Sequence, residues 1–201
     1  MRSIKGITPS LVVCANPSPN LFVARFDKVE VQLRQPRRKD SGRCRLAWAD
    51  LSEKSKRRYR RANVDKQLYD MKYRCQLPLY RGWVPGWLPL IMETDNTIVA
   101  FVDIMFKTGD SEFKKFLIKP EETGMACSIG VLDKYQGLGF GTAYSFLTDE
   151  IGRHFGINWI LGSTYAQGGM RNIRIADNWE KIREYRAPSG EIMIDHRLRL
   201  K

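Results

Sequence analysis

The chain has 201 residues and a formal net charge of +12, a length that allows one substantial hydrophobic core and leaves little room for two complete domains. Hydrophobic residues make up 43% of it and charged residues 28%, which excludes a disordered chain. No apolar run approaches the roughly 18 residues that a membrane-spanning helix needs, so no membrane association is expected.

The cysteine and histidine contents narrow the possible chemistry. The chain has four Cys and two His, and the cysteines are too far apart in the sequence to form a metal-type pair. A histidine-rich metal centre is therefore excluded, and no metal is expected. Reduced cysteines favour a cytoplasmic location.

The positive charge is concentrated in one region. Residues 25–81 carry 18 Lys or Arg and 7 Asp or Glu, whereas the rest of the chain carries 16 and 15. Such a region attracts polyanions, for example nucleic acid or an acidic protein face. A solvated basic face that keeps the protein in solution explains the same composition equally well.

The N-terminal part of the chain predicts an arm, a strand and a turn. Residues 1–25 contain three prolines and no clear period, and we interpret them as an irregular N-terminal arm before a single domain over residues 26–201. Residues 26–33 alternate apolar and polar side chains, which predicts a half-buried strand. Residues 36–42 then form a basic turn.

Two helices and a loop are predicted next. Asp50 and Glu53 form a capping box for a helix over residues 50–61, which is almost entirely basic. Apolar side chains at helical spacing predict a second helix over residues 64–75. Residues 77–90 are rich in Pro, Gly and aromatic side chains, and we expect them to close the edge of a core or to line an acceptor pocket.

Residues 90–93 and 98–106 are predicted to form two strands. Asp95 and Asn96 lie between them, and these residue types favour a tight hairpin turn. We therefore expect an antiparallel strand pair in this part of the chain.

The stretch over residues 125–155 is the best candidate for a functional site. Residues 126–132 form a short apolar run typical of a buried strand, and a loop with alternating glycines follows over residues 136–141. After the loop, apolar residues recur at helical spacing as far as Phe155. The order is therefore strand, glycine loop and helix.

This loop predicts a phosphate site over residues 136–142. Alternating glycines leave backbone N–H groups uncovered by side chains, and at the positive end of a helix such groups bind phosphate. The spacing differs from the G-x-G-x-x-G of dinucleotide-binding folds, and the lysine of a P-loop is absent. A glycine turn without any ligand is the alternative.

Three further elements are predicted towards the C-terminus. Residues 158–164 are short and apolar, which is typical of a buried strand. Apolar residues from Met170 to Ile182 recur at helical spacing and predict a helix. Residues 191–200 alternate as a last strand.

The glycine loop resembles the coenzyme A loop of the GNAT superfamily of N-acetyltransferases. The family pattern is Q/R-x-x-G-x-G/A, and Gln136, Gly139 and Gly141 match its fixed positions. Val131 lies five residues before Gln136, where the family has the valine that ends the strand, and Tyr135 matches the usual aromatic residue before the loop. The predicted order of strands and helices is also that of the GNAT fold.

The resemblance implies an α/β fold with a mixed, mostly antiparallel central sheet and helices on both faces. It implies acetyl-CoA as the cofactor and direct transfer of its acetyl group to an amine acceptor. In the family, the pantetheine arm lies where the central strand and the next strand splay apart, and it pairs with the backbone of the central strand. The residues implied in coenzyme binding here are Ile129, Val131, Gln136, Gly137, Leu138, Gly139, Phe140, Gly141 and Thr142.

The catalytic residues depart from the family pattern. Many members have a Glu on the central strand as base and a Tyr in the last helix, after an Asn, as acid. The central strand here has no Glu, and if Asn172 is that Asn, the Tyr position holds Trp179. Tyr165, which ends the strand beside the expected gap, is the preferred acid. Weaker candidates for the acid are the phenols of Tyr144 and Tyr185, and weaker candidates for the base are the carboxylates of Glu93 and Asp103. Arg171 and Arg174 are candidate contacts to the coenzyme phosphates or the acceptor. A solvated helix face explains these two arginines equally well.

Two functions fit this sequence. The first is an N-acetyltransferase with an anionic or nucleic-acid-associated acceptor, because the predicted basic helices border the acceptor side in this fold. Nucleic acid or an acidic protein would then bind through residues 34–81. The second is a catalytically degenerate GNAT-like domain that binds nucleic acid or a partner protein.

Overall fold

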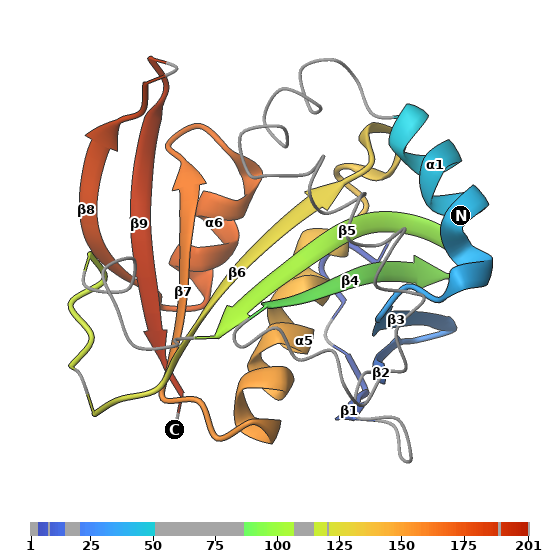
Figure 1. The fold of residues 1–201 in the computed structure, drawn as a ribbon, viewed down its shortest axis with the longest axis horizontal. Helices are drawn as coiled ribbons and strands as arrows, with labels where there is room; N and C mark the ends of the chain where they lie inside the picture. The colour runs from blue at the N-terminus through green and yellow to red at the C-terminus, as the bar shows by residue number, and fades with distance from the viewer. Residues whose placement is uncertain are drawn as a thin grey trace.

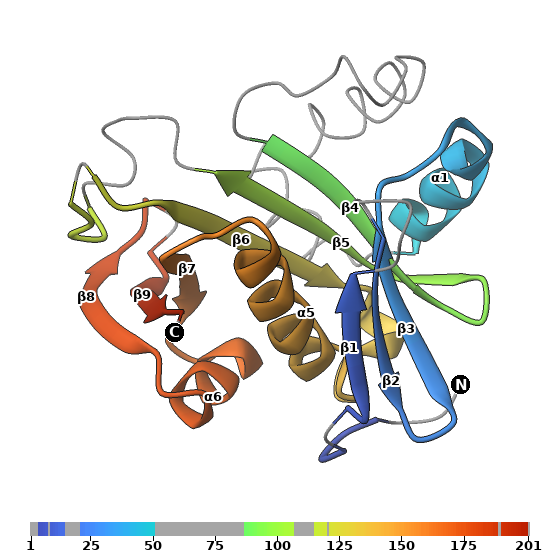
Figure 2. The same ribbon diagram turned by 90° about the horizontal axis from the view of Figure 1, so that it is seen from below.

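A single sheet with helices on both of its faces is seen in the computed structural model (Figures 1 and 2). The structure describes residues 4–7, 9–14, 21–50, 87–106, 115–119, 121–188 and 190–200. The strands in this part of the chain are β1 (Leu11–Cys14), β2 (Leu21–Phe26), β3 (Val29–Arg34), β4 (Trp87–Thr94), β5 (Thr97–Phe106), β6 (Gly124–Val131), β7 (Trp159–Tyr165), β8 (Glu180–Arg186) and β9 (Ile192–Arg199). The helices are α1 (Ser41–Ala49), α5 (Phe140–His154) and α6 (Gly169–Ala176), with the short 3-10 helices η1 (Arg38–Asp40) and η2 (Asp133–Tyr135).

The nine described strands are ordered β1-β2-β3-β4-β5-β6-β7-β9-β8. Every neighbouring pair in this part of the chain is antiparallel except β6 and β7, which are parallel. The expected mixed, mostly antiparallel sheet is confirmed. Within the described residues, no helix has both the length and the apolar content needed to cross a membrane.

The expectation of an irregular arm over residues 1–25 was wrong for two segments. β1 and β2 pair with each other, and β2 pairs with β3, so both strands extend the sheet. Phe22, Ala24 and Phe26 are fully buried at every second position of β2, which is the pattern of a strand with one face on the core.

The hairpin between β4 and β5 is confirmed. Asp95 and Asn96 both have positive φ angles, 47° and 57°, as a tight turn between antiparallel strands requires. The paired register runs from Thr94 opposite Thr97 to Trp87 opposite Met105.

The basic turn expected over residues 36–42 instead contains η1 and the start of a helix. α1 begins at Ser41 and ends at Ala49, just before the expected start at Asp50. Its Cys44 and Ala47 are buried against the sheet, and this short apolar face was not detected beside the stronger capping signal at residues 50–53. The rest of the two predicted helices and residues 77–86 lie outside the described residues.

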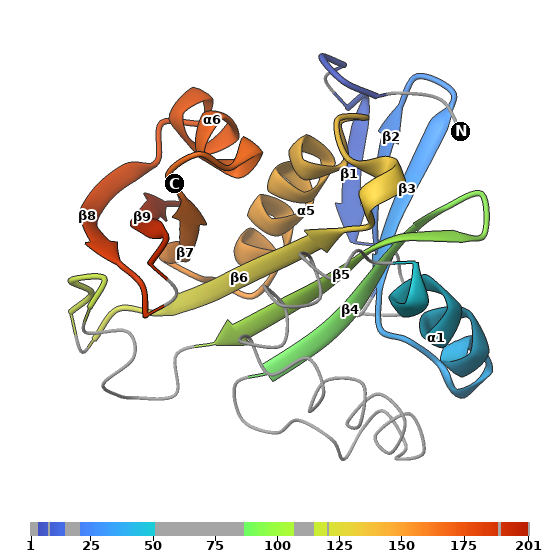
Figure 3. The same ribbon diagram turned by 90° about the horizontal axis from the view of Figure 1, so that it is seen from above.

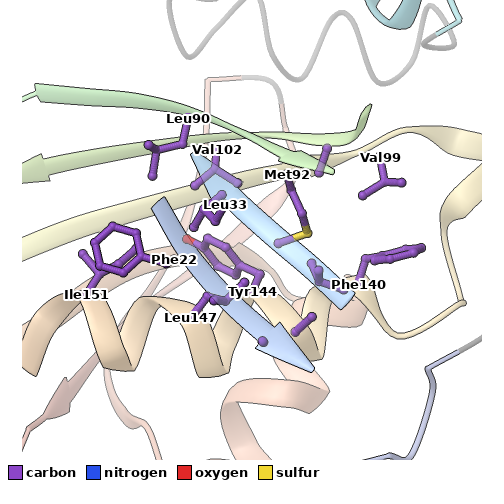
Figure 4. Packing of buried hydrophobic residues seen from close by; sticks show 14 of the residues in the cluster. Phe22, Leu33, Leu90, Met92, Val99, Val102, Phe140, Tyr144, Leu147 and Ile151 are labelled. Atoms are coloured by element: carbon purple, nitrogen blue, oxygen red, sulfur yellow. The ribbon is translucent and has the colours of Figure 1, made fainter. Parts of the chain in front are cut away.

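α5 and α1 pack on opposite faces of the sheet (Figures 2 and 3). Figure 4 shows Phe140, Leu147 and Ile151 of α5 lying against side chains of the strands, among them Phe22 and Leu33. Burial of each such side chain contributes about 1.5–3 kcal/mol. This core fixes the position of α5, and with it the loop that precedes the helix.

The last predicted helix is shorter than expected. α6 ends at Ala176, and Ile182 lies in β8 rather than in the helix. Asn178 has a φ of 58°, and the Trp179 N–H donates to the Arg174 carbonyl at 2.9 Å, so the chain reverses here. Apolar residues therefore recur at helical spacing beyond Ala176 although the helix has ended there.

Candidate functional site

β6 and β7 are joined over only three residue pairs. The pairs run from Gly124 opposite Trp159 to Ala126 opposite Leu161, and the pairing then ends. Figure 1 shows the two strands beginning together and diverging towards their C-terminal ends. β6 stays paired with β5 as far as Val131, so its other edge faces the opening beyond Ala126.

The backbone groups of Ile129 and Val131 face this opening. The Leu132 N–H donates to the Val99 carbonyl at 2.9 Å, which makes these two residues a hydrogen-bonded antiparallel pair. Because such pairs alternate along a ladder, the backbone groups of Val131 and Ile129 point away from β5. The Val131 carbonyl accepts a hydrogen bond from Gln136 Nε2 at 3.2 Å.

The glycine loop lies at the C-terminal end of β6 and leads into α5. Gly137 and Gly139 have φ angles of 78° and 98°, values that an L-residue adopts only with strain. Gly139 is the residue that caps α5, and no side chain bonds to the cap. The N–H groups of Gly139, Phe140 and Gly141 have no hydrogen-bond partner among the described residues.

The dipole of α5 favours binding of an anion at the glycine loop. The first turn of α5 contains no acidic side chain, whereas its last turn contains Arg153 and His154. The positive end of the helix dipole is therefore not neutralised by a carboxylate from its own first turn. Unpartnered N–H groups at such an end form an anion-binding site.

A side chain would meet different surroundings at each of the three glycines of the loop. A side chain on Gly139 would collide with the backbone of residues 4 and 5, at 2.6 Å from the Lys5 nitrogen, and the Ile4 N–H donates to the Leu138 carbonyl at 2.7 Å. A side chain on Gly141 would collide with Ile173 of α6 at 2.9 Å. Gly137 has open space around its Cβ position.

Arg174 of α6 is buried beside the point where β6 and β7 separate. Its side chain is 3% exposed, and its guanidinium covers Gly162, the first residue of β7 beyond the last pair with β6. Any side chain on Gly162 would collide with the guanidinium. The guanidinium carbon lies 4.4 Å from the centre of the Trp179 ring.

Titratable side chains from three other elements surround Arg174. Burial raises the pKa of Cys127 on β6 to about 12, and Tyr144 of α5 is hydrogen-bonded to it. On β9, burial and then the charge of Arg174 lower the pKa of His196 to about 4. Burial lowers the pKa of Arg174 itself, and Tyr144 and Cys127 oppose that shift.

Several buried polar atoms of this cluster have no hydrogen-bond partner within the described part of the chain. They are Nε and Nη1 of Arg174, Nε1 of Trp179 and Nδ1 of His196, whereas His196 Nε2 lies 3.1 Å from Thr164 Oγ1. Buried polar atoms without partners are rare in folded proteins. The cluster can therefore receive an acceptor or an anion.

Sequence reasoning treated Arg174 as equally suited to a solvated face, and the structure corrects this. Met170, Ile173 and Arg174 follow the spacing of one helix face, which was the available signal. A glycine within an apolar strand, here Gly162, also indicates a close approach by another group.

The structure does not bring Tyr165 and Asn172 together. Side chains alternate along β7, so Tyr165 and Ser163 lie on the face opposite to Gly162 and α6. Asn172 is exposed on α6. Their assignment as catalytic residues stays a prediction.

Glu93 has a structural role. It accepts from Arg34 Nε at 2.6 Å and from Arg43 Nη2 at 2.9 Å, and it is buried. Asp103 is also buried, opposite Ser128 of β6. Neither observation adds support for a catalytic base on β4 or β5.

The basic region is only partly described. Arg34 and Arg43 pair with Asp40 and Glu93, so their charges are neutralised locally. Arg37, Lys39 and Arg45 are exposed. The basic run over residues 54–61 lies outside the described residues.

No protein-family model and no curated protein matches the chain. Among solved structures, an aminoglycoside N(6')-acetyltransferase from Legionella pneumophila is 11% identical, with a TM-score of 0.58, and the match covers 85% of this chain and 92% of that one. The GNAT domain of a protein named PAT from S. lividans is 14% identical, with a TM-score of 0.55 and coverage of 85% and 91%. YncA from Salmonella typhimurium, solved with acetyl-CoA, is 14% identical, with a TM-score of 0.53 and coverage of 85% and 94%. At these identities the likeness shows the fold, and the chain has the fold of the GNAT acetyltransferases.

Proposed function

We propose that this chain, which has the GNAT fold, is an acetyl-CoA-dependent N-acyltransferase that transfers an acetyl group directly to an amine. One observation carries the proposal. β6 and β7 separate after three residue pairs, and the opening leads to a helix start with unpartnered N–H groups. An extended ligand with an anionic group at one end fits this combination.

The residues of the loop fit the diphosphate of the coenzyme. Gly137 leaves open space above the loop, and the N–H groups from Gly139 to Gly141 are available as donors. Ile129 and Val131 would pair with the amides of the pantetheine arm, because their backbone groups face the opening. The proposed binding residues remain these two and the loop over residues 136–142.

Acetyl-CoA supplies an activated acetyl group when bound. The protein contributes chiefly position, because holding thioester and amine together removes much of the entropic barrier. An N–H of β6 facing the thioester oxygen would stabilise the negative charge that develops there. Tyr165 remains the proposed acid, on the face of the sheet opposite to α6.

We also propose an anionic or nucleic-acid-associated acceptor. The basic excess of residues 25–81 supports it, and α1 lies beside the loop, where Lys134 Nζ pairs with Asp50 at 2.6 Å. Acceptor binding should weaken steeply as salt rises, because counterions are released from a polyanion. A flat salt response would count against this acceptor class.

Isothermal titration with acetyl-CoA and CoA tests the coenzyme site. Gly139 is a poor probe, because its substitution also disturbs residues 4 and 5. Gly137→Asp and Gly137→Asn form a better pair, since both residues tolerate a positive φ and differ in charge. We expect Asp to weaken binding at least about tenfold more than Asn, ~1.4 kcal/mol. Equal affinities of the two variants for the coenzyme would mean that no phosphate binds at this loop.

A binding module without catalysis is the second candidate. Trp179 at the expected Tyr position favours it. Release of free thiol from acetyl-CoA in the presence of amine acceptors separates the two candidates. Coenzyme binding without acceptor-dependent thiol release would support the binding module.

A further inference from the structure

The guanidinium of Arg174 is buried with incomplete hydrogen bonding. The residue is 3% exposed, and among the described residues neither Nε nor Nη1 has an acceptor. Desolvating an ion is unfavourable by several kcal/mol unless an opposite charge or full hydrogen bonding offsets it. The charge of Asp195 acts on Arg174, but this carboxylate accepts hydrogen bonds from Ser163 and Arg183 instead. Within the described part of the chain, the fold therefore holds a preformed donor group whose hydrogen bonds are incomplete.

This donor group lies at the closed end of the opening between β6 and β7. It covers Gly162, next to the last β6–β7 pair, and it is close enough to Cys127 of β6 for their charges to interact. From Val131, beside the glycine loop, back to Cys127 is four residues of strand, about 13 Å. A ligand anchored by its diphosphate at the loop and extended along β6 therefore has its far end near Arg174.

Trp179 adds a second donor at the same place. The centre of its ring lies 4.4 Å from the guanidinium carbon, and its Nε1 is buried with no acceptor among the residues that the structure describes. Neither group releases a proton readily, because an arginine keeps its charge and an indole N–H only donates a hydrogen bond. The pair is suited to holding an anion rather than to protonating it.

We propose that Arg174 is a catalytic residue that stabilises the coenzyme thiolate formed when the acetyl group is transferred, with Trp179 as a second donor. This inference rests on the proposed function, and it replaces one part of it: Arg174 takes over from the Tyr165 phenol as the group that acts on the departing sulfur. An acetyl group is the only group transferred, and no redox step is involved.

The proposed step balances without another reactant. The lone pair of the amine nitrogen forms the C–N bond, and the electron pair of the C–S bond goes to sulfur as a thiolate. The amide nitrogen loses its proton to the solvent. The thiolate stays paired with Arg174 until CoA leaves and takes a proton from the solvent.

The experiment compares CoA with desulfo-CoA, which lacks only the sulfur. Isothermal titration of the whole chain with each ligand, from about pH 6 to about pH 9, brackets the ordinary thiol pKa near 8.5. If the site favours the thiolate, the affinity ratio of CoA to desulfo-CoA rises with pH, about tenfold for each unit by which the thiol pKa falls. We expect a rise of at least about tenfold.

The ratio isolates the thiol from the other titrating groups. The titratable or charged side chains that face the cluster are Cys127 of β6, Tyr144 and Asp149 of α5, Arg171 of α6, Lys181 of β8, and Asp195 and His196 of β9. Those that do not touch the sulfur affect both complexes alike. Cys127 and His196 also titrate outside the window, since their pKa values lie near 12 and near 4.

Three variants on α6 assign the effect to a residue. Arg174→Met removes the charge, and the affinity ratio should then be flat with pH. Arg171→Met, at an exposed position of the same helix, should keep the wild-type rise of the ratio, because any contact to the coenzyme phosphates affects both ligands alike. Arg174→Lys keeps a charge on a shorter donor and should keep part of the rise.

The outcomes distinguish this inference from the proposed function. A flat ratio in the wild type, with both ligands bound, overturns the role of Arg174 and leaves coenzyme binding intact. An undiminished rise in Arg174→Met also overturns it. If neither ligand binds the wild type, the proposed function fails and this inference fails with it. The wild-type measurement is decisive by itself, even if a variant does not fold.

Discussion

The guanidinium carbon of Arg174 lies 4.4 Å from the centre of the Trp179 ring, and this distance is within the range of a cation–π contact. A desolvated cation–π contact contributes about 2 kcal/mol. Desolvation of an unpaired ion is unfavourable by several kcal/mol. The contact therefore offsets only part of what burial of Arg174 costs the free protein.

Arg174→Met should stabilise the free protein. Methionine fills similar space without a charge, so the variant avoids the desolvation of a buried ion, which is unfavourable by several kcal/mol. Chemical denaturation should show a free energy of unfolding about 1–2 kcal/mol higher than wild type. Arg171→Met is the control and should stay within ~0.5 kcal/mol. A loss of stability in Arg174→Met would mean that the guanidinium is well paired in the folded chain.

Gly139→Ala should destabilise the protein more than Gly137→Ala. Both positions have positive φ angles, so each substitution is unfavourable by about 1–2 kcal/mol. At Gly139 the new methyl also displaces the backbone beside Ile4, which is fully buried. Complete loss of that burial would cost about 1.5–3 kcal/mol, so a partial loss adds a fraction of this.

Denaturation and limited trypsin digestion check this difference. Cleavage after Lys5 should accelerate in Gly139→Ala and stay near the wild-type rate in Gly137→Ala, because only the first substitution pushes residues 4 and 5 away from the loop. Equal stability and equal cleavage in both variants would contradict the contact between the loop and residues 4 and 5.

Local signals in the sequence predicted the elements around the glycine loop. The turn at Asp95 and Asn96 and the succession of strand, loop and helix through α5 depend on residues that are neighbours in the chain. β2 and α1 were missed because their apolar faces are short. The end of α6 was missed because a positive φ at Asn178 interrupts a pattern that continues beyond it.

The loop was predictable for the same reason, and the Arg174 cluster was not. Alternating glycines are visible in the sequence alone. The burial of Arg174 depends on Gly162 of β7 and Trp179 beyond the helix, and only the fold brings these together. In the same way, nothing near Gly139 in the sequence indicates that residues 4 and 5 pack against it.

Arg34→Met should be strongly destabilising. Arg34 donates to Asp40 Oδ2 at 2.7 Å and to Glu93 Oε1 at 2.6 Å, and all three side chains are buried. Although burial alone raises the pKa of Asp40, hydrogen bonds from Arg34 and the Arg37 N–H lower it overall. Removing one partner leaves buried carboxylates uncompensated, at about 3–5 kcal/mol.

Arg25→Met provides the matched control for the buried network. Arg25 pairs with Glu30 at 3.1 Å, but both side chains are largely exposed, so its loss should change the free energy of unfolding by no more than ~1 kcal/mol. Because the pKa of Asp40 is lowered in the fold, the network's contribution is lost as pH falls below about 4. Similar effects of the two substitutions at neutral pH would refute the buried network.

Asp149 and His196 should give opposite pH dependences of stability. Burial raises the pKa of Asp149 to about 6, with Arg153 opposing the shift. The folded state therefore holds this proton more tightly, and its contribution is lost as pH rises from about 4 to about 6. Burial and Arg174 lower the pKa of His196 to about 4, so its contribution is lost as pH falls from about 6.5 towards 4.

Single substitutions should expose each of these two dependences, which largely cancel in the wild type. In His196→Gln only the contribution of Asp149 remains, and the free energy of unfolding should fall as pH rises from about 4 to about 6, by at most ~1.4 kcal/mol per pH unit. In Asp149→Asn only the contribution of His196 remains, and the free energy of unfolding should rise over the same interval. Urea denaturation at a series of pH values measures both slopes. The carboxylates with lowered pKa values titrate mainly below this interval, so they add the same pH dependence to the free energy of unfolding of all three proteins. Parallel pH profiles for wild type and both variants would show that neither side chain is buried as the structure places it.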